Sequence, residues 1–361
     1  MTDYWDQLTA EIDNAAPERR YQHYRPLADA AEEFISEAQD NERFYLGIEE
    51  LDQQMRGVGA SHLLLLNGFT HSGKTQVALH SMRHNRHKRV LMYTADEPAS
   101  LVLAKLAAMT TGVGARELEE RIMAEDREAM RLMREVATTE FPNLIVISKP
   151  LSPIVIEDGY EEACEVWSAE PEVIFLDYVE LIQAGDSVQA KFDYLKSFGI
   201  RKHKPLVALH QTSRSAGADG REMTISSGAY GGEQHATFVV GVRRKKYALL
   251  AEIRDLEAKL RKGGRGADDA AWRLSQAVGD LAVAEYTVTI NLVKSKRPGS
   301  MNVDEIDMEL ALSTGRLYRL RPDSLPTQYK PARRASTPIP PPTWTEPELD
   351  YDESTDWSDI S

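Results

Sequence analysis

The sequence has few cysteines and no long hydrophobic run. Cys164 is the single cysteine among 361 residues, which excludes an internal disulfide and a Cys/His zinc cluster. A reducing compartment, most simply a cytoplasm, is therefore expected. The longest apolar run, 63–66, has the length of a strand, far short of the roughly 18 residues that a membrane span needs. The first residues have neither the basic nor the apolar region of a secretory signal.

Charge of one sign is unevenly distributed along the chain. The formal net charge is −14, which at first sight argues against a nucleic-acid partner, and 42% hydrophobic with 28% charged residues excludes disorder throughout. Residues 1–44 carry a net −7 and residues 321–361 a net −4, whereas residues 201–300 carry a net +8. The basic interior block is compatible with a polyanion site, although many of these charges also suit solvated helix faces.

The middle of the chain alternates strand-like and helix-like segments. Such alternation predicts an α/β fold with a mostly parallel twisted sheet flanked by helices, in a single domain over residues 45–320. Expected strands are 62–67, 89–94, 143–148, 173–177, 206–210, 237–242 and 287–293, and expected helices are 74–85, 99–109, 115–137, 157–168 and 187–199.

Three segments depart from this rhythm. Residues 247–286 have apolar residues at helical spacing on both sides of a Gly-rich turn, which predicts an inserted helical hairpin. A surface decoration is one interpretation of it, and a DNA or partner arm is the other. Residues 1–44 are expected to form an N-terminal helical arm. Residues 321–361 are rich in proline and acidic residues, which is typical of a disordered tail.

The most specific motif is G-x-x-x-x-G-K-[ST], the phosphate-binding P-loop. It follows an apolar run and precedes a helical pattern, the strand–loop–helix order that the motif requires. Its glycines let backbone N–H groups surround an anion at a helix N-terminus. Lys74 is expected to reach the β- and γ-phosphates, and the hydroxyl of Thr75 to hold Mg²⁺. The motif comprises Gly68, Phe69, Thr70, His71, Ser72, Gly73, Lys74 and Thr75.

Two further apolar strands end in acidic residues. Asp177 closes the strand 173–177 about a hundred residues after the P-loop, the pattern of a second metal-binding carboxylate. Asp96 and Glu97 follow the strand 89–94 and are candidates for orienting the attacking water. Acidic residues also favour a helix N-terminus for electrostatic reasons, so both roles are compatible. Reach favours Glu97, but the adjacency of the two acids leaves the choice open.

The order of these motifs resembles the RecA-like ATPases, and in particular the DnaB-type replicative helicases. Residues 45–52 resemble the "T-G-x-x-x-L-D" segment ahead of the P-loop, and residues 93–98 resemble "S-L-E-M-P". Four later segments resemble "D-Y-L-Q-L-M", "P-V-V-A-L-S-Q-L-N-R-S", "S-G-A-I-E-Q-D-A-D" and "K-Q-R-N-G"; they begin at Asp177, Pro205, Ser227 and Lys294. The resemblance covers roughly residues 45–315.

The resemblance implies a RecA-like core that assembles into a ring, usually a hexamer, with ATP and Mg²⁺ at subunit interfaces. Gln211 would sense the γ-phosphate, and the loop 212–226 with Arg214 and Arg221 would contact single-stranded DNA. One basic residue of the last resembling segment, which begins at Lys294, would be a finger that reaches the γ-phosphate of a neighbouring subunit. The candidates are Lys294, Lys296 and Arg297.

The chain also departs from the helicase pattern. Only about 44 residues stand where the family has its N-terminal helical domain, so the sequence resembles a phage-encoded short form, which would act in a host cytoplasm. The leading hypothesis is an ATP-dependent DNA helicase that translocates on single-stranded DNA during replication, with partners docking on the arm or tail. The alternatives are a RecA/RadA-like recombination or repair ATPase and an ATP-binding protein without turnover.

Overall fold

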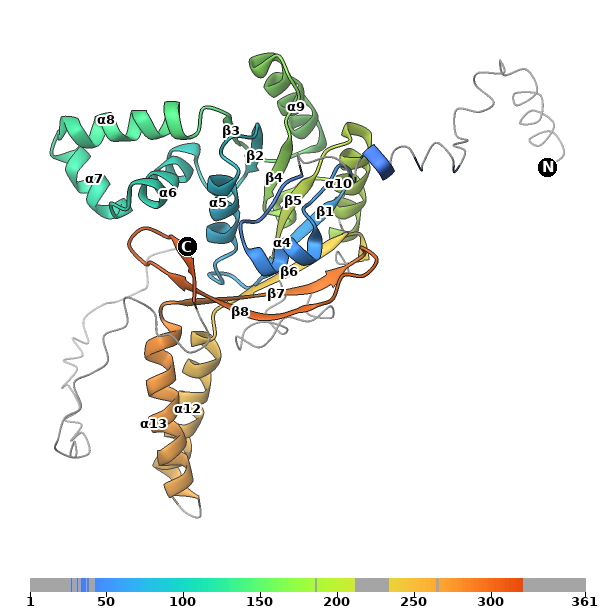
Figure 1. The fold of residues 1–361 in the computed structure, drawn as a ribbon. Coiled ribbons are helices and arrows are strands. Elements are labelled where there is room, and N and C mark those ends of the chain that lie inside the picture. The colour runs from blue at the N-terminus through green and yellow to red at the C-terminus, as the bar shows by residue number, and fades with distance from the viewer. Residues whose placement is uncertain are drawn as a thin grey trace, which may run out of the picture.

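A computed structural model describes residues 27, 31, 34–36, 38, 43–185, 187–211, 234–263 and 266–320. The expected arm of residues 1–44 and tail of residues 321–361 lie almost entirely outside this part, and the domain limits stay predictions. Within the described residues the chain forms a nine-stranded sheet flanked by helices (Figure 1). The expected α/β fold with a mostly parallel sheet is confirmed.

The sheet has the strand order β3-β2-β4-β5-β1-β6-β7-β8-β9. The six strands from β3 to β6 run parallel, and β7, β8 and β9 continue the sheet as an antiparallel edge. Seven strands lie within two residues of the expected ranges; β8 and β9 were not expected. The bounds are β1 Leu63–Gly68, β2 Val90–Thr94, β3 Leu144–Ser148, β4 Val173–Asp177, β5 Leu206–Gln211, β6 Phe238–Arg243, β7 Thr287–Ser295, β8 Val303–Leu310 and β9 Leu317–Arg319.

Helices cover both faces of the parallel part of the sheet. Leu64 and Leu66 of β1 belong to one hydrophobic core with α4, α5 and α6, and Leu63 and Leu65 belong to the other with α9 and α10. Strands buried on both faces explain why these segments are continuous apolar runs. The bounds are α4 Glu49–Met55, α5 Lys74–His84, α6 Ala99–Thr111, α7 Ala115–Met123, α8 Arg127–Glu135, η1 Val136–Glu140, α9 Pro153–Trp167, η2 Val179–Leu181 and α10 Val188–Lys202.

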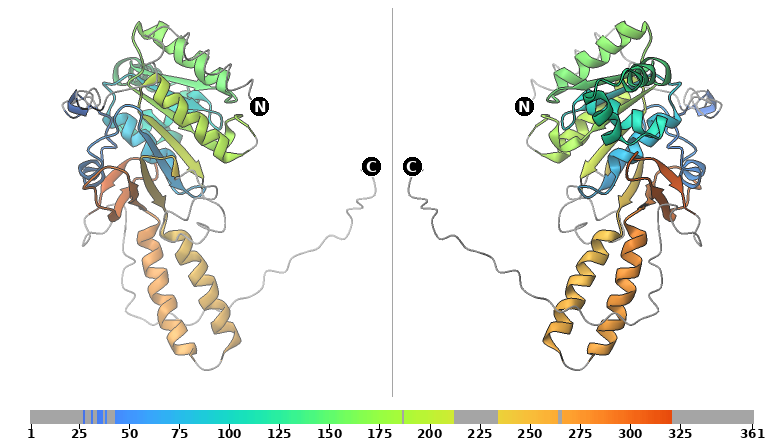
Figure 2. Two further views of the ribbon diagram at one scale, coloured as in Figure 1. Left: turned by 90° about the vertical axis from the view of Figure 1, so that its right-hand side faces the viewer. Right: turned by 90° about the vertical axis from the view of Figure 1, so that its left-hand side faces the viewer.

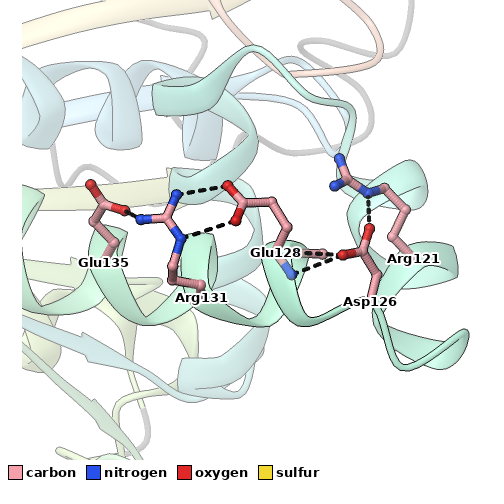
Figure 3. A network of polar contacts seen from close by, with 6 residues as sticks. Arg121, Asp126, Glu128, Arg131 and Glu135 are labelled. Atoms are coloured by element: carbon pink, nitrogen blue, oxygen red, sulfur yellow. Dashed lines mark hydrogen bonds and ion pairs between the residues drawn. The ribbon is translucent and has the colours of Figure 1, made fainter.

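The helix expected at 115–137 is broken into α7 and α8 (Figure 3). Asp126 caps α8, because its carboxylate accepts the backbone N–H groups of Glu128 and Ala129 at 2.8 and 3.3 Å. Arg121 at the end of α7 donates to the other oxygen of Asp126 at 2.7 Å. Aspartate is more favourable at the N-cap of a helix than in a helix interior, so a new helix begins here. The hydrophobic spacing in the sequence does not reveal this break.

The inserted helical hairpin is present between β6 and β7. Its helices are α12 (Lys246–Lys262) and α13 (Ala267–Ala284), which lie side by side and project away from the sheet (Figures 1 and 2). Trp272 on α13 is 64% exposed. No helix among the described residues is both long and apolar enough to cross a membrane.

Candidate functional site

The site lies where four parallel strands end. In the sheet register, Gly68 at the end of β1 pairs with Gln211 at the end of β5, and Asp177 at the end of β4 pairs with Thr94 of β2 and Leu209 of β5. Because carboxyl ends of parallel strands meet at one edge, residues far apart in sequence converge there. Ligands of open α/β sheets bind at this edge.

The P-loop connects β1 to the N-terminus of α5. Gly73 has φ 103°, a left-handed conformation that favours glycine, and α5 begins at the next residue. A Cβ at Gly68 would come within 2.4 Å of the carbonyl oxygen of Val242 and of Ser72 Oγ. Only glycine allows so close an approach of the backbones. The Ser72 hydroxyl is buried and has no hydrogen-bonding partner, as expected of a cradle shaped for an anion.

Lys74 lies in the centre of this loop. Its ammonium group donates to the carbonyl oxygens of Gly68 and Phe69 at 2.8 and 2.9 Å. Burial lowers the pKa of Lys74 to about 8, and the negative charges of Glu180 and Asp177 oppose this shift. A buried ammonium group of lowered pKa gains stability from an added anion, so this environment favours phosphate binding.

Three carboxyl groups face the loop. Burial raises the pKa of Asp177 to about 7; the charges of Glu97 and Asp96 add to this shift, and those of Lys74 and Lys105 oppose it. Glu97 forms an ion pair with Lys105 of α6 through Oε1, while its Oε2 is buried without a hydrogen-bonding partner. Mutual repulsion of carboxylates in a buried cluster is relieved by a divalent cation.

Gln211, the last residue of β5, is hydrogen-bonded to the P-loop through its side chain. Its side-chain Nε2 donates to Thr70 Oγ1 at 2.5 Å, and its backbone N–H donates to Glu180 Oε1 at 2.8 Å. The side chain therefore lies against the loop that would hold the terminal phosphate.

These groups line one cavity of about 260 Å³. Among the residues that the structure describes, no group of three or more His, Cys, Asp and Glu could hold a metal ion by itself. A Mg²⁺ here would need phosphate oxygens beside Asp177 and Thr75, and the residues present fit a triphosphate with Mg²⁺. The lining residues are Thr70, His71, Ser72, Gly73, Lys74, Thr75, Gln76, Asp96, Glu97, Lys105, Asp177, Tyr178 and Gln211.

The three finger candidates lie at the opposite edge of the sheet. Lys294 pairs in register with Val239 of β6, and the backbone N–H of Lys296 donates to Thr237 at 2.9 Å. The backbone N–H of Thr237 in turn donates to Leu63, the first residue of β1. The P-loop begins at Gly68, which is the last residue of β1, and therefore lies at the other end of the strand. Arg297, Lys296 and the basic residues Arg43, Arg56 and Lys196 line a separate cavity of about 680 Å³.

The DNA-contact candidates Arg214 and Arg221 lie outside the described residues. The sequence interpretation missed three residues that line the cavity, namely Gln76, Lys105 and Tyr178. It also missed Glu180, which does not line the cavity but accepts the backbone N–H of Gln211. Lys105 lies two helical turns after Glu97, and Glu180 lies three residues after Asp177, so helical spacing and proximity to a site residue were the available signals. Neither signal distinguishes such residues from ordinary surface charges.

Together, the parallel sheet, the P-loop and the strand-end carboxylates define a P-loop nucleotide-binding domain. The family model of the DnaB-like helicase C-terminal domain matches residues 45–273. The match covers well over half of the chain, and the chain therefore belongs to the DnaB-like helicase C-terminal domain family. Membership implies ATP hydrolysis by a RecA-like ATPase domain.

Solved structures show the same fold. The chain is similar to a solved structure of an ATPase domain, with a TM-score of 0.58, 17% identity, 82% of this chain and 97% of that chain covered. It is also similar to one titled "The Structure Of A DnaB-Like Replicative Helicase And Its Interactions With Primase", with a TM-score of 0.59 and 17% identity. There the match covers 82% of this chain and 66% of that chain. No curated protein sequence matches the chain.

Proposed function

We propose that the chain is an ATP-dependent DNA helicase that translocates on single-stranded DNA during replication. The observation that carries this proposal is the contact between the P-loop and the end of β5. Gln211 touches Thr70 with its side chain, and the segment 212–226, which contains Arg214 and Arg221, follows it directly. Phosphate state and DNA contact would thus be coupled through one residue.

The residues that line the cavity have different roles in the proposed hydrolysis of ATP. The N–H groups of the loop and Lys74 bind the phosphates, and Lys74 exchanges its two carbonyl partners for them. Thr75 and Asp177 would hold Mg²⁺, which would supply positive charge against the charge that develops on the phosphate oxygens. Glu97, or Asp96, orients the attacking water and accepts its proton. Lys105 must release Glu97 Oε1 or share it with that water.

Hydrolysis is proposed to need a second copy of the chain. Lys296 is level with the first residue of β1 and Gly68 is its last, a separation of roughly 16 Å along a strand. This exceeds the length of a lysine side chain, so Lys296 does not reach its own cavity. Lys294 donates instead to the carbonyl oxygen of Gln234, and Arg297 lines the second cavity. A finger from this edge would act on the ATP of a neighbour, as in a ring of six copies. The N-terminal arm and acidic tail would be available to replication partners.

The deciding experiment is ATP-dependent strand separation on a forked duplex, with the oligomer mass measured on the same sample. Unwinding by a closed ring would support the helicase. ATP-dependent strand exchange by a filament would instead support a recombination or repair ATPase. Doubly substituted protein, Arg214→Ala with Arg221→Ala, should bind single-stranded DNA more weakly and with a flatter salt dependence. Unchanged affinity would remove that loop from the proposal.

A further inference from the structure

A buried glutamate–histidine pair lies next to the phosphate cavity and takes no part in the chemistry above. Glu180 is in η2, three residues after Asp177, and His210 is the residue of β5 before Gln211. His210 has no exposed surface. Its Nδ1 lies 2.5 Å from Glu180 Oε1. Neither residue lines the cavity.

The carboxylate of Glu180 also holds the γ-phosphate sensor. The oxygen that contacts His210 accepts the backbone N–H of Gln211 at 2.8 Å. Gln211 then reaches Thr70 of the P-loop at 2.5 Å. Glu180 is itself fixed from the other side, because Lys191 of α10 donates to its carbonyl oxygen at 2.5 Å. A continuous path of contacts therefore runs from the P-loop through Gln211 to Glu180 and His210.

This buried pair lowers the folding stability of the protein, which is not expected of residues with a purely structural role. The second carboxylate oxygen of Glu180 and the Nε2 of His210 are buried without hydrogen-bonding partners. The imidazole packs edge-on against Phe192, with ring centroids 5.2 Å apart. A partly satisfied buried polar pair costs stability relative to apolar or neutral residues of similar size, and such departures concentrate at functional sites.

We propose that Glu180 and His210 are positioning residues that fix the backbone of Gln211, so that the sensor distinguishes ATP from ADP. His210 holds the carboxylate in place, and the carboxylate holds the Gln211 N–H. The path ends at residue 211, where the segment proposed to bind DNA begins. This inference rests on the proposed function of the same site. The motifs that the sequence resembles have glutamine and serine at these two positions, so the acid–base pair is a departure of this chain.

The experiment uses the full chain with Glu180→Ala, Glu180→Gln, His210→Ser and the double variant Glu180→Gln/His210→Ser. The matched control is Glu172→Ala. Glu172 is 20% exposed against 21% for Glu180, and it also accepts a backbone N–H at 2.8 Å, from Arg89, away from the cavity. Measurements are kcat and KM for ATP with and without single-stranded DNA, and equilibrium binding of ADP and a non-hydrolysable ATP analogue. Thermal melting reports the fold of each variant.

Glu180→Ala should lower kcat about tenfold with KM nearly unchanged, and should reduce the preference for the ATP analogue over ADP by a similar factor. Glu180→Gln keeps an acceptor for the Gln211 N–H and should lose only about threefold. The double variant should be closer to wild type than His210→Ser alone, because it removes the carboxylate that His210→Ser leaves without its imidazole. If Glu180→Ala fails to fold, the glutamine and serine variants decide.

Two results would overturn the inference. One is Glu180→Ala behaving like Glu172→Ala in every readout. The other is a double variant that carries the full sum of the single losses, which would show that the two residues act separately. Absence of ATPase activity in the wild type would refute the proposed function instead, and the analogue-to-ADP binding ratio would still test the pair.

Discussion

Replacing Asp177 by asparagine should stabilise the nucleotide-free protein, and more so at high pH than at low pH. Asp177 is 4% exposed, and its pKa is raised from 3.8 to about 7. The native state therefore binds a proton between these values that the unfolded chain has released, and stability falls as pH rises through this window. Asparagine has nearly the same shape and no charge to desolvate, so Asp177→Asn removes this loss.

The size of the effect follows from the two pKa values. One pKa unit corresponds to about 1.4 kcal/mol, so the ionised carboxylate costs about 4 kcal/mol at pH 8.0. At pH 5.5 the native group is still protonated while the unfolded group is ionised, and the cost is about 2 kcal/mol. The stabilisation by Asp177→Asn should thus grow by about 2 kcal/mol between pH 5.5 and pH 8.0.

Urea unfolding of both proteins at several pH values, with a chelator present to remove divalent cations, measures this difference. Asp255→Asn on the exposed surface of α12 is the control and should show no trend. A stability difference for Asp177→Asn that stays flat from pH 5.5 to pH 8.0 would refute the reasoning. The carboxylate would then be ionised in the empty site without cost, and its environment would be far more polar than the structure shows.

Three further predictions concern the same cavity. Lys74→Ala should abolish ATP turnover and leave the melting profile folded; undiminished turnover would reject the P-loop assignment. Gly68→Ala should cost about 1–3 kcal/mol of stability, because the added Cβ would lie 2.4 Å from two atoms. Gly279→Ala, in open space on α13, should instead stabilise by about 0.5–1 kcal/mol, and urea titrations that rank the two variants otherwise would contradict this reasoning. Of Asp96→Asn and Glu97→Gln, the variant that loses turnover while retaining ATP binding identifies the water-orienting acid, and full activity in both would exclude the segment.

The sequence predicted the parts of the fold that depend on local patterns. Strands such as β1 and β4 are continuous apolar runs because both of their faces are buried, and this signal is strong. β8 was missed because only part of it is buried and because its sequence, VDEIDMEL, is rich in acids and contains no continuous apolar run. The break between α7 and α8 depends on the side chain of Asp126, which an apolar periodicity does not register.

The candidate site was predictable where a motif fixes the backbone and unpredictable where side chains meet across the sheet. The P-loop, Asp177 and Gln211 come from strand ends in a recognisable order, and the register brings them to one edge. Lys105 lines the cavity only because α6 lies beside it, and Glu180 of η2 meets the site only at the backbone N–H of Gln211. Charged residues in such positions look like any surface charge until the tertiary contacts are known.

The two edges of the sheet have opposite charge character, and this bears on assembly. The carboxyl edge gathers Asp96, Glu97 and Asp177 around the phosphate cavity, while the amino edge gathers Lys296, Arg297 and other bases around the second cavity. A single copy does not bring these edges together, because a strand length separates them. Two copies in head-to-tail contact would do so, and a heterologous contact of this kind gives a ring when its rotation closes and a filament when it does not. Under the proposed function, the choice between a helicase ring and a recombinase filament would therefore depend on the rotation between copies.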